Sequence, residues 1–229
     1  MTIHRFFVEA EEVAGDRFPL PGSIERQVRT VLRMGDGDRV VLLDGAGSEL
    51  ACRLEGDACI VDERRPASGE PAHRLTISQA LLKGDGLEQV VQHGTEVGVA
   101  RFRLVLTERC VARELSPRRL ERLRTIAREA AEQSERGVVP AVEAPVRFAD
   151  ALASASVLLF ERHDGARLGS LPSPTEILIG PEGGFSPAEV QSATMAGLVL
   201  AGLGPRILRS ETVAVAAAAV ILSRTGDFA

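Results

Sequence analysis

The chain has 229 residues, enough for one large or two small domains, and the 45% that are hydrophobic suffice for a buried core. The net charge of −5 argues against generic nucleic-acid binding, and 3% aromatic residues, without Trp or Tyr, argue against base recognition on an aromatic stacking platform. Cys52, Cys59 and Cys110 form no CxxC pair, so we expect neither a metal site nor a disulfide framework, and we expect a reducing, cytoplasmic location. The N-terminus lacks the apolar stretch of a signal peptide, and we expect no membrane span.

The first seventy residues have the pattern of β structure with one helix. Arg39–Leu43, Glu49–Leu54 and Ala58–Asp62 alternate with turn residues and predict three strands. Apolar residues at helical spacing predict a helix over Ser23–Arg33. Together these elements predict a small β-barrel with a helix, and the Pro- and Gly-containing segment Pro66–Pro71 predicts a linker.

From about residue 73 the pattern changes to alternating strands and helices. The expected strands are 75–82, 102–106, 157–160, 177–179 and 198–201, and the expected helices are 87–97, 116–135, a helix that starts at Ser186, and one that starts near Glu211. This alternation is typical of an α/β fold with a mostly parallel sheet and helices on both faces. We therefore expect a second domain over residues 71–229.

Two Gly- and Pro-containing loops each follow an apolar strand and precede a helix. The first runs from Gly180 to Gly184, ahead of a capping box with Ser186 as N-cap and Glu189 at the third helical position. The second runs from Leu203 towards Ser210, which the sequence favours as the N-cap of an Ala-rich helix. Neither loop is a P-loop or a GxGxxG turn. Since open α/β sheets bind ligands at the carboxyl ends of their strands, both loops predict a ligand site built largely from backbone.

The pair Gly-Pro-Glu-Gly-Gly and Leu-Gly-Pro-Arg-Ile-Leu-Arg-Ser-Glu-Thr, at 180–184 and 203–212, resembles the RsmE family of 16S ribosomal RNA uridine-N3 methyltransferases, in the knotted SPOUT superfamily. Further matching segments occur in the same order along nearly the whole chain, at 4–8, 31–35, 83–85, 95–99, 108–110 and 132–136. One departure is Glu135, where the family usually has Gly.

The resemblance implies a fold, a cofactor and a reaction. It implies a PUA-like RNA-binding barrel over residues 1–70, a trefoil-knotted SPOUT domain over residues 71–229, and a homodimer. The implied reaction is methyl transfer from S-adenosylmethionine to N3 of one uridine in the 16S ribosomal RNA of the small subunit. The cofactor-binding residues carried over are Phe160, Glu161, Ile179, Gly180, Pro181, Glu182, Gly183, Gly184, Leu200, Leu203, Gly204, Ile207, Leu208, Arg209, Ser210 and Thr212. The RNA-binding residues carried over are Arg5, Arg33, Arg109 and Arg136.

Methyl transfer to N3 of uracil requires that the proton on N3 leaves. Glu211 is the candidate general base, and Arg209 and Arg5 are candidate cations that stabilise the uracil anion. The sequence does not choose between these two modes. Two alternatives stay open: a ribose 2′-O-methyltransferase on the same scaffold, and a non-catalytic RNA-binding factor of ribosome assembly whose Gly-rich loops are only turns.

Overall fold

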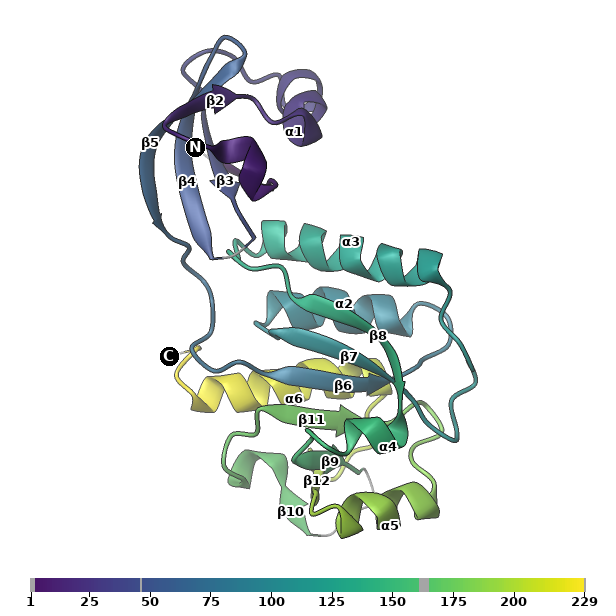
Figure 1. Cartoon of the computed structure of the whole chain (residues 1–229). Coiled ribbons are helices and arrows are strands. Elements are labelled where there is room, and N and C mark those ends of the chain that lie inside the picture. Colours follow the sequence, from purple (N-terminus) through teal and green to yellow (C-terminus); the bar gives the residue numbers. More distant parts are fainter. Residues whose placement is uncertain (1–2, 46, 161–164, 229) are drawn as a thin grey trace. The chain divides into compact units, whose positions relative to one another are not determined.

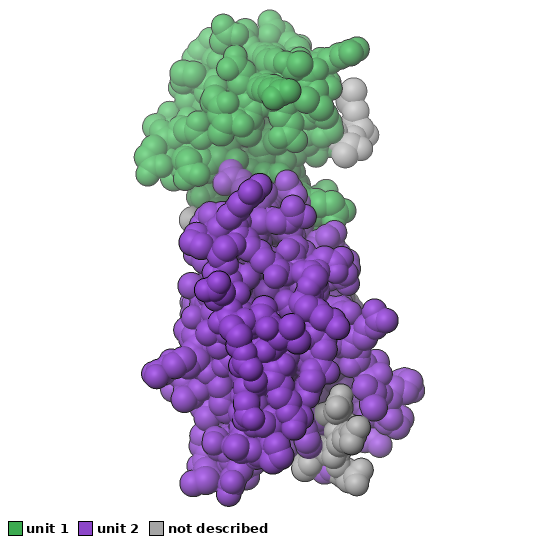
Figure 2. Space-filling model, turned by 90° about the vertical axis from the view of Figure 1, so that its right-hand side faces the viewer, with its two compact units in different colours: residues 1–70, 131–139 green, residues 71–130, 140–229 purple. Residues whose placement is uncertain are grey.

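The computed structural model describes residues 3–45, 47–160 and 165–228, which fold into two compact units (Figures 1 and 2). Unit 1 comprises residues 1–70 together with residues 131–139, and unit 2 comprises residues 71–130 and 140–229. The sequence pattern did not predict that residues 131–139 belong to unit 1. Among the described residues, no helix is both long and apolar enough to cross a membrane.

Unit 1 is built on one five-stranded mixed sheet. Its strands are β1 (His4–Phe7), β2 (Arg17–Pro19), β3 (Arg39–Leu43), β4 (Ser48–Glu55) and β5 (Ala58–Pro66), in the order β1-β3-β4-β5-β2. β1 pairs with β3 in parallel, and the other pairs are antiparallel. β1 and β2 are the edges of this sheet in the described part of the chain. The strand pairing is therefore that of an open sheet, where the sequence predicted a barrel.

The predicted helix of unit 1 begins where expected but ends early. α1 (Gly22–Arg26) continues into one π-helical turn over Gln27–Val31, and Ile24 and Val28 are buried against the sheet's core cluster. Arg33, which follows, has a φ of 55°. Since the left-handed region is unfavourable for residues with a Cβ, a helix cannot continue through Arg33.

A second apolar cluster joins the return segment 131–139 to the sheet of unit 1. Ala131 and Val139 pack with Phe7, Val41 and Leu43. The N–H of Phe7 also donates a hydrogen bond of 3.1 Å to the carboxylate of Glu132. Residues distant in the sequence therefore complete the core of this unit.

Unit 2 contains a seven-stranded sheet in which every pair of neighbouring strands is parallel (Figure 1). The strands are β6 (Thr76–Ala80), β7 (Arg101–Leu106), β8 (Ala141–Arg147), β9 (Val157–Leu159), β10 (Ala166–Arg167), β11 (Glu176–Ile179) and β12 (Val199–Gly202), in the order β10-β12-β9-β11-β6-β7-β8. The five predicted strands are all present. The two edge strands β8 and β10 were not predicted.

Helices lie on both faces of this sheet, as the alternating pattern predicted. The helices are α2 (Gly86–Glu96), α3 (Pro117–Gln133), α4 (Phe148–Ala151), α5 (Pro187–Met195) and α6 (Ser210–Arg224). α4 and α5 cover one face, where Leu158 and Leu178 belong to their apolar cluster. α2 lies against the other face: a Cβ on its Gly94 would stand 2.7 Å from the ring of Phe102. α2 also packs against α6.

Candidate functional site

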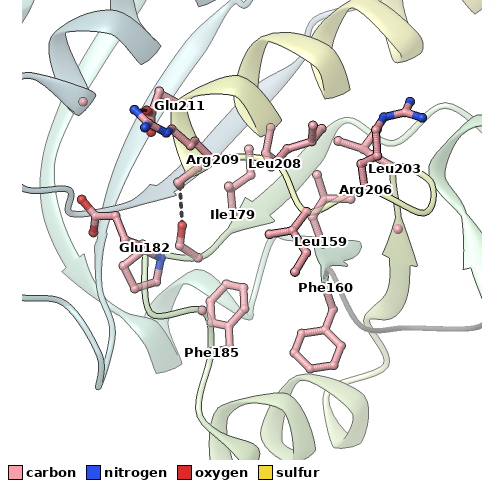
Figure 3. Close-up of a pocket in the computed structure, with 18 of the residues that line it drawn as sticks. Leu159, Phe160, Ile179, Glu182, Phe185, Leu203, Arg206, Leu208, Arg209 and Glu211 are labelled. Atoms are coloured by element: carbon pink, nitrogen blue, oxygen red, sulfur yellow. Dashed lines mark hydrogen bonds and ion pairs between the residues drawn. The ribbon is translucent and has the colours of Figure 1, made fainter.

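A cavity of about 640 Å³ lies at the carboxyl ends of β9, β11 and β12, beside the start of α6 (Figure 3). The predicted cofactor-binding residues that line it are Phe160, Ile179, Gly180, Pro181, Glu182, Gly184, Leu203, Gly204, Ile207, Leu208, Arg209 and Ser210. The candidate base Glu211 also lines it. Both Gly-rich loops thus meet at one cavity, because β11 and β12 flank β9 on either side.

Four predicted residues do not line this cavity. Glu161 lies outside the described residues. Gly183 faces Arg109, whose guanidinium donates a hydrogen bond of 3.1 Å to its carbonyl. Leu200 packs in the apolar cluster under α4 and α5, and Thr212 is exposed on α6.

The first loop is held rigidly at its helical end. Ser186 and Glu189 form the predicted capping box: the N–H of Ser186 donates to Glu189 at 2.9 Å, and the N–H of Glu189 donates to the Ser186 hydroxyl at 3.2 Å. The carboxylate of Glu189 also accepts from the N–H of Glu108, in the turn that follows β7, at 2.8 Å. Gly184 has a φ of 65°, a conformation that favours glycine. The loop therefore has one well-defined path between strand and helix.

Ser210 does not have the predicted role of N-cap. The cap position of α6 is Arg209, which makes no side-chain capping bond, and Ser210 is the first helical residue. The Ser210 hydroxyl donates a hydrogen bond of 2.6 Å to the carbonyl of Gly180 and accepts one of 2.9 Å from the side-chain amide of Gln79. The first N–H groups of α6, with the positive end of the helix dipole, border the cavity without a side-chain cap, and such groups favour polar or anionic ligand atoms.

Charged side chains stand around the start of α6. Arg209 is 87% exposed, and its guanidinium lies 4.0 Å from the carboxylate of Glu211, which is 21% exposed. Figure 3 shows these two side chains together beside the cavity. Arg206 lines the cavity from the second loop. The start of α6 and the second loop thus present both a carboxylate and cations to a ligand.

Sequence reasoning missed the loop that follows β6. Lys83, the only lysine of the chain, lines the cavity with Gly84, Asp85 and Gly86. The N–H of Lys83 donates a hydrogen bond of 3.0 Å to the carboxylate of Glu182, which ties this loop to the first Gly-rich loop. The segment 83–85 resembles the family, but the sequence alone assigned no function to its residues. The other cavity residues that were not predicted are Leu159, Phe185, Ala201, Gly202, Arg206 and Val213.

Two of the predicted RNA-binding arginines are engaged inside unit 1. Arg5 lies 2.7 Å from the carboxylate of Glu49 and 3.3 Å from that of Glu135. Arg136 is 2% exposed, and its guanidinium lies 2.8 Å from the carboxylate of Glu70. A buried and paired guanidinium is not presented to a phosphate, so Arg136 holds the return segment instead.

The other two predicted RNA-binding arginines are exposed. Arg33 lies on the surface of unit 1 after the helical turn. Arg109 lines a second cavity of about 600 Å³ in unit 2, with Gly183, Phe185 and Val190. Among the described residues, no group of three His, Cys, Asp or Glu side chains is arranged to hold a metal ion.

In a parallel α/β unit, a cavity at the carboxyl edge of the sheet is the usual place for a small ligand or cofactor, so the fold and the cavity define a ligand-binding α/β protein. The family model described as an RNA methyltransferase domain matches residues 69–222. The chain is also 32% identical to ribosomal RNA small subunit methyltransferase E of Bacillus subtilis, over 97% of both chains. The chain therefore belongs to the ribosomal RNA small subunit methyltransferase E family.

Solved structures agree with this membership. The crystal structure of a ribosomal RNA small subunit methyltransferase E from Neisseria gonorrhoeae, bound to S-adenosyl methionine, is 30% identical, with a TM-score of 0.87 over 97% of this chain and 98% of that one. A methyltransferase of Legionella pneumophila, solved in complex with the same cofactor, is 25% identical, with a TM-score of 0.84 over 98% of both chains.

Proposed function

We propose that the protein is an S-adenosylmethionine-dependent methyltransferase that modifies N3 of one uridine in 16S ribosomal RNA, and that the cavity at the start of α6 holds the cofactor. The observation that carries the proposal is the meeting of the two Gly-rich loops with the uncapped start of α6 at one cavity. Its volume of about 640 Å³ falls in the range of small-molecule sites. The related structures that hold this cofactor support the same assignment.

The residues present suit this cofactor chemically. Leu203, Ile207 and Leu208 give the cavity an apolar wall for an aromatic base. Backbone groups of the two loops and the first N–H groups of α6 supply hydrogen bonds and a favourable dipole for polar atoms. S-adenosylmethionine, when bound, supplies an electrophilic methyl group. The contribution of the chain is then to hold the two reacting atoms in line.

Two residues at the start of α6 are proposed to handle the proton on N3 of the uracil. Glu211 is the candidate base, and Arg209 is the candidate cation that stabilises the charge left on the uracil carbonyls. Arg5 has no catalytic role in this proposal, because Glu49 already neutralises its guanidinium. The Glu211→Gln variant tests the base: it should bind cofactor and RNA normally, lose turnover, and regain part of it as rising pH ionises the uracil unaided. Full activity across pH would leave Glu211 as only a helix-start residue.

We also propose that unit 1 is a PUA-like RNA-binding domain, that the sheet of unit 2 carries the trefoil knot, and that the enzyme is a cytoplasmic homodimer paired through α6. The half-buried apolar positions Val215, Ala216, Ala219 and Val220 of α6 support the last point, since such a face suits an interface. Light scattering at micromolar concentration tests the dimer. A monomeric mass would contradict it.

Exposed Arg33 and Arg109 are the proposed RNA contacts. The Arg33→Ala variant should weaken RNA binding while cofactor affinity stays at the wild-type value. The slope of log affinity against log salt concentration should also become shallower by about one. Each phosphate contact releases about one counterion from the RNA on binding, so losing one contact lowers the number released by about one. An unchanged slope would remove Arg33 from the interface.

The cofactor site is tested by filling the cavity. The Leu208→Trp variant places a large side chain on the cavity wall and should abolish S-adenosylmethionine binding in a calorimetric titration. The matched control is Met195→Trp, at an 82% exposed residue of α5 that does not line the cavity, and it should bind normally. Normal binding by Leu208→Trp would show that the cofactor lies elsewhere.

The reaction is tested on ribosomal RNA. An N3-methyl group blocks the pairing edge of uracil, so RNA from wild-type cells should give one reverse-transcriptase stop that is absent from cells lacking the gene. Nucleoside analysis of the methylated product separates the outcomes. A 2′-O-methylated nucleoside would mean the ribose methyltransferase instead, and failure of the purified protein to bind S-adenosylmethionine would mean a non-catalytic factor.

A further inference from the structure

Gln79 is a polar side chain in the middle of the core of unit 2. It lies on β6, opposite Ile179 of β11 and Leu104 of β7 in the sheet register, and it is completely buried. Its Oε1 is the one buried side-chain nitrogen or oxygen atom of the described residues that has no hydrogen-bond partner. A buried acceptor without a donor destabilises the folded state, so a residue of this kind in a central strand calls for a compensating role.

The amide nitrogen of Gln79 is fully engaged, and two of its three partners, Ser210 and Gly180, line the cavity. It donates to the Ser210 hydroxyl at 2.9 Å and to the Ala80 carbonyl at 3.1 Å, and it lies 3.4 Å from the Gly180 carbonyl. The Ser210 hydroxyl has a single proton, which it donates to Gly180 at 2.6 Å (Figure 3, dashed line). Ser210 must therefore accept from Gln79, and the three residues form one directed chain of hydrogen bonds.

This chain joins three separate elements: strand β6, the first Gly-rich loop, and the first residue of α6. Gly180 and Ser210 line the cavity, whereas Gln79 does not. Ser210 contributes nothing as a helix cap, so its hydroxyl is left to bind the loop. The consequence is that the loop and the N–H groups of α6 are fixed relative to each other, and alignment on the ångström scale is what methyl transfer requires.

We propose that Gln79 is a positioning residue, which acts through Ser210 to hold the two walls of the cofactor cavity in register. The proposal rests on the cofactor site proposed above. This role accounts for an amide with an unsatisfied oxygen in a central strand. The amide nitrogen orients Ser210, and the unpartnered oxygen destabilises the fold as a consequence. A residue that merely filled the core would be replaced by an apolar side chain without functional loss.

The Gln79→Met variant separates these two roles. Methionine has a similar length and removes both the unpartnered oxygen, which destabilises the fold, and the donated hydrogen bonds, which stabilise it, so the thermal unfolding midpoint of the cofactor-free protein should change little. The dissociation constant for S-adenosylmethionine should nevertheless rise about tenfold or more, since Ser210 loses the donor that orients it. The KM for RNA should be unchanged. A lower unfolding midpoint with wild-type cofactor affinity would overturn the proposal.

A double-mutant cycle tests the route through Ser210. If Gln79 acts by way of the Ser210 hydroxyl, the Ser210→Ala variant already removes its effect, and Gln79→Met/Ser210→Ala should bind cofactor no more weakly than Ser210→Ala alone. The Ser210→Thr variant keeps a hydroxyl and should restore most of the affinity that Ser210→Ala loses. Additive effects of the two substitutions would overturn the proposal.

The cavity-filling variant distinguishes failure of this proposal from failure of the cofactor site. Loss of binding in Leu208→Trp with normal binding in Gln79→Met would leave the site intact and remove Gln79 from it. Normal binding in Leu208→Trp would remove the site, and the role of Gln79 with it.

Discussion

The guanidinium of Arg5 lies 2.7 Å from the carboxylate of Glu49, whose side chain is only 1% exposed. Arg65 donates a second hydrogen bond to the same carboxylate. Burial by itself would raise the pKa of Glu49, but the hydrogen bonds and charges of Arg5 and Arg65 outweigh burial and hold the pKa below its usual value of 4.5. Arg5 is therefore first of all the counterion of a buried carboxylate in the sheet of unit 1.

This pair predicts how the stability of unit 1 depends on pH. A carboxyl group with a lowered pKa in the folded state stabilises the fold above its unfolded pKa, and this contribution is lost as the pH falls through the folded value. Urea unfolding of the wild type should therefore show a loss of stability below about pH 4.5, of which part is absent in the Glu49→Gln variant. At pH 7 that variant should itself be less stable, since the arginines lose their charge partner. If the stability of the wild type and that of Glu49→Gln fall in parallel with decreasing pH, the lowered pKa of Glu49 does not contribute to stability.

Glu135 has a φ of 60°, in the left-handed region that favours glycine. The Glu135→Gly variant should relieve backbone strain and stabilise the protein by about 0.5–1 kcal/mol. Its ion pair with Arg5 is lost, but the Glu135 side chain is 66% exposed, and exposed pairs contribute little. Thermal unfolding measures the change, with Glu135→Ala as the control. Because alanine keeps the Cβ and the strain, that control should not be stabilised.

Lys83 is the only lysine of the chain, and it lines the cavity. The other permanently charged cations of the chain are arginines. An ammonium is a compact point charge and a guanidinium is a planar fork, so the two are not equivalent beside a bound ligand. Both Lys83→Met and Lys83→Arg should lower the methylation rate, the first by about tenfold or more. Single-turnover kinetics with saturating cofactor measures the effect. Wild-type rates in Lys83→Met would mean that Lys83 only borders the cavity.

The cysteines should be inert in the folded protein. Burial raises the pKa of the Cys52 thiol to about 12 and that of Cys59 to about 11, and Cys110 is 2% exposed. Since the thiolate is the reactive form, a chromogenic disulfide reagent at pH 8 should label none of the three within minutes, and all three once urea unfolds the chain. Rapid labelling of Cys52 or Cys59 in the native protein would show that the core of unit 1 opens readily.

The sequence predicts the central strands and the site loops well because both depend on local signals. Runs such as Ile177–Ile179 are buried on both faces, and Gly and Pro follow them where the backbone must turn. Strand β8 escapes prediction because it lies at the edge of its sheet, contains Pro145 and is only partly buried. A periodic apolar pattern is therefore absent from it.

The role of Ser210 could not be predicted because its partners are remote. Local preference makes a serine before a helix an N-cap, but Gln79 and Gly180 lie 131 and 30 positions away in the sequence. Tertiary bonds override the local preference in this case. For the same reason the pattern of residues 1–70 alone does not reveal that Ala131 and Val139 complete their core.

The return segment 131–139 has a consequence for synthesis on the ribosome. The apolar face formed by Phe7, Val41 and Leu43 is synthesised early. Ala131 and Val139, which cover it, follow some ninety positions after Leu43, after β6, α2, β7 and most of α3 of the other unit. The amino-terminal part of the chain therefore waits with an apolar face uncovered while much of unit 2 is translated, although proteins generally fold their first domain first. In a nascent chain stalled near residue 130, protease should cleave within the first seventy residues. A longer stalled chain, in which residue 139 has left the exit tunnel, should resist this cleavage.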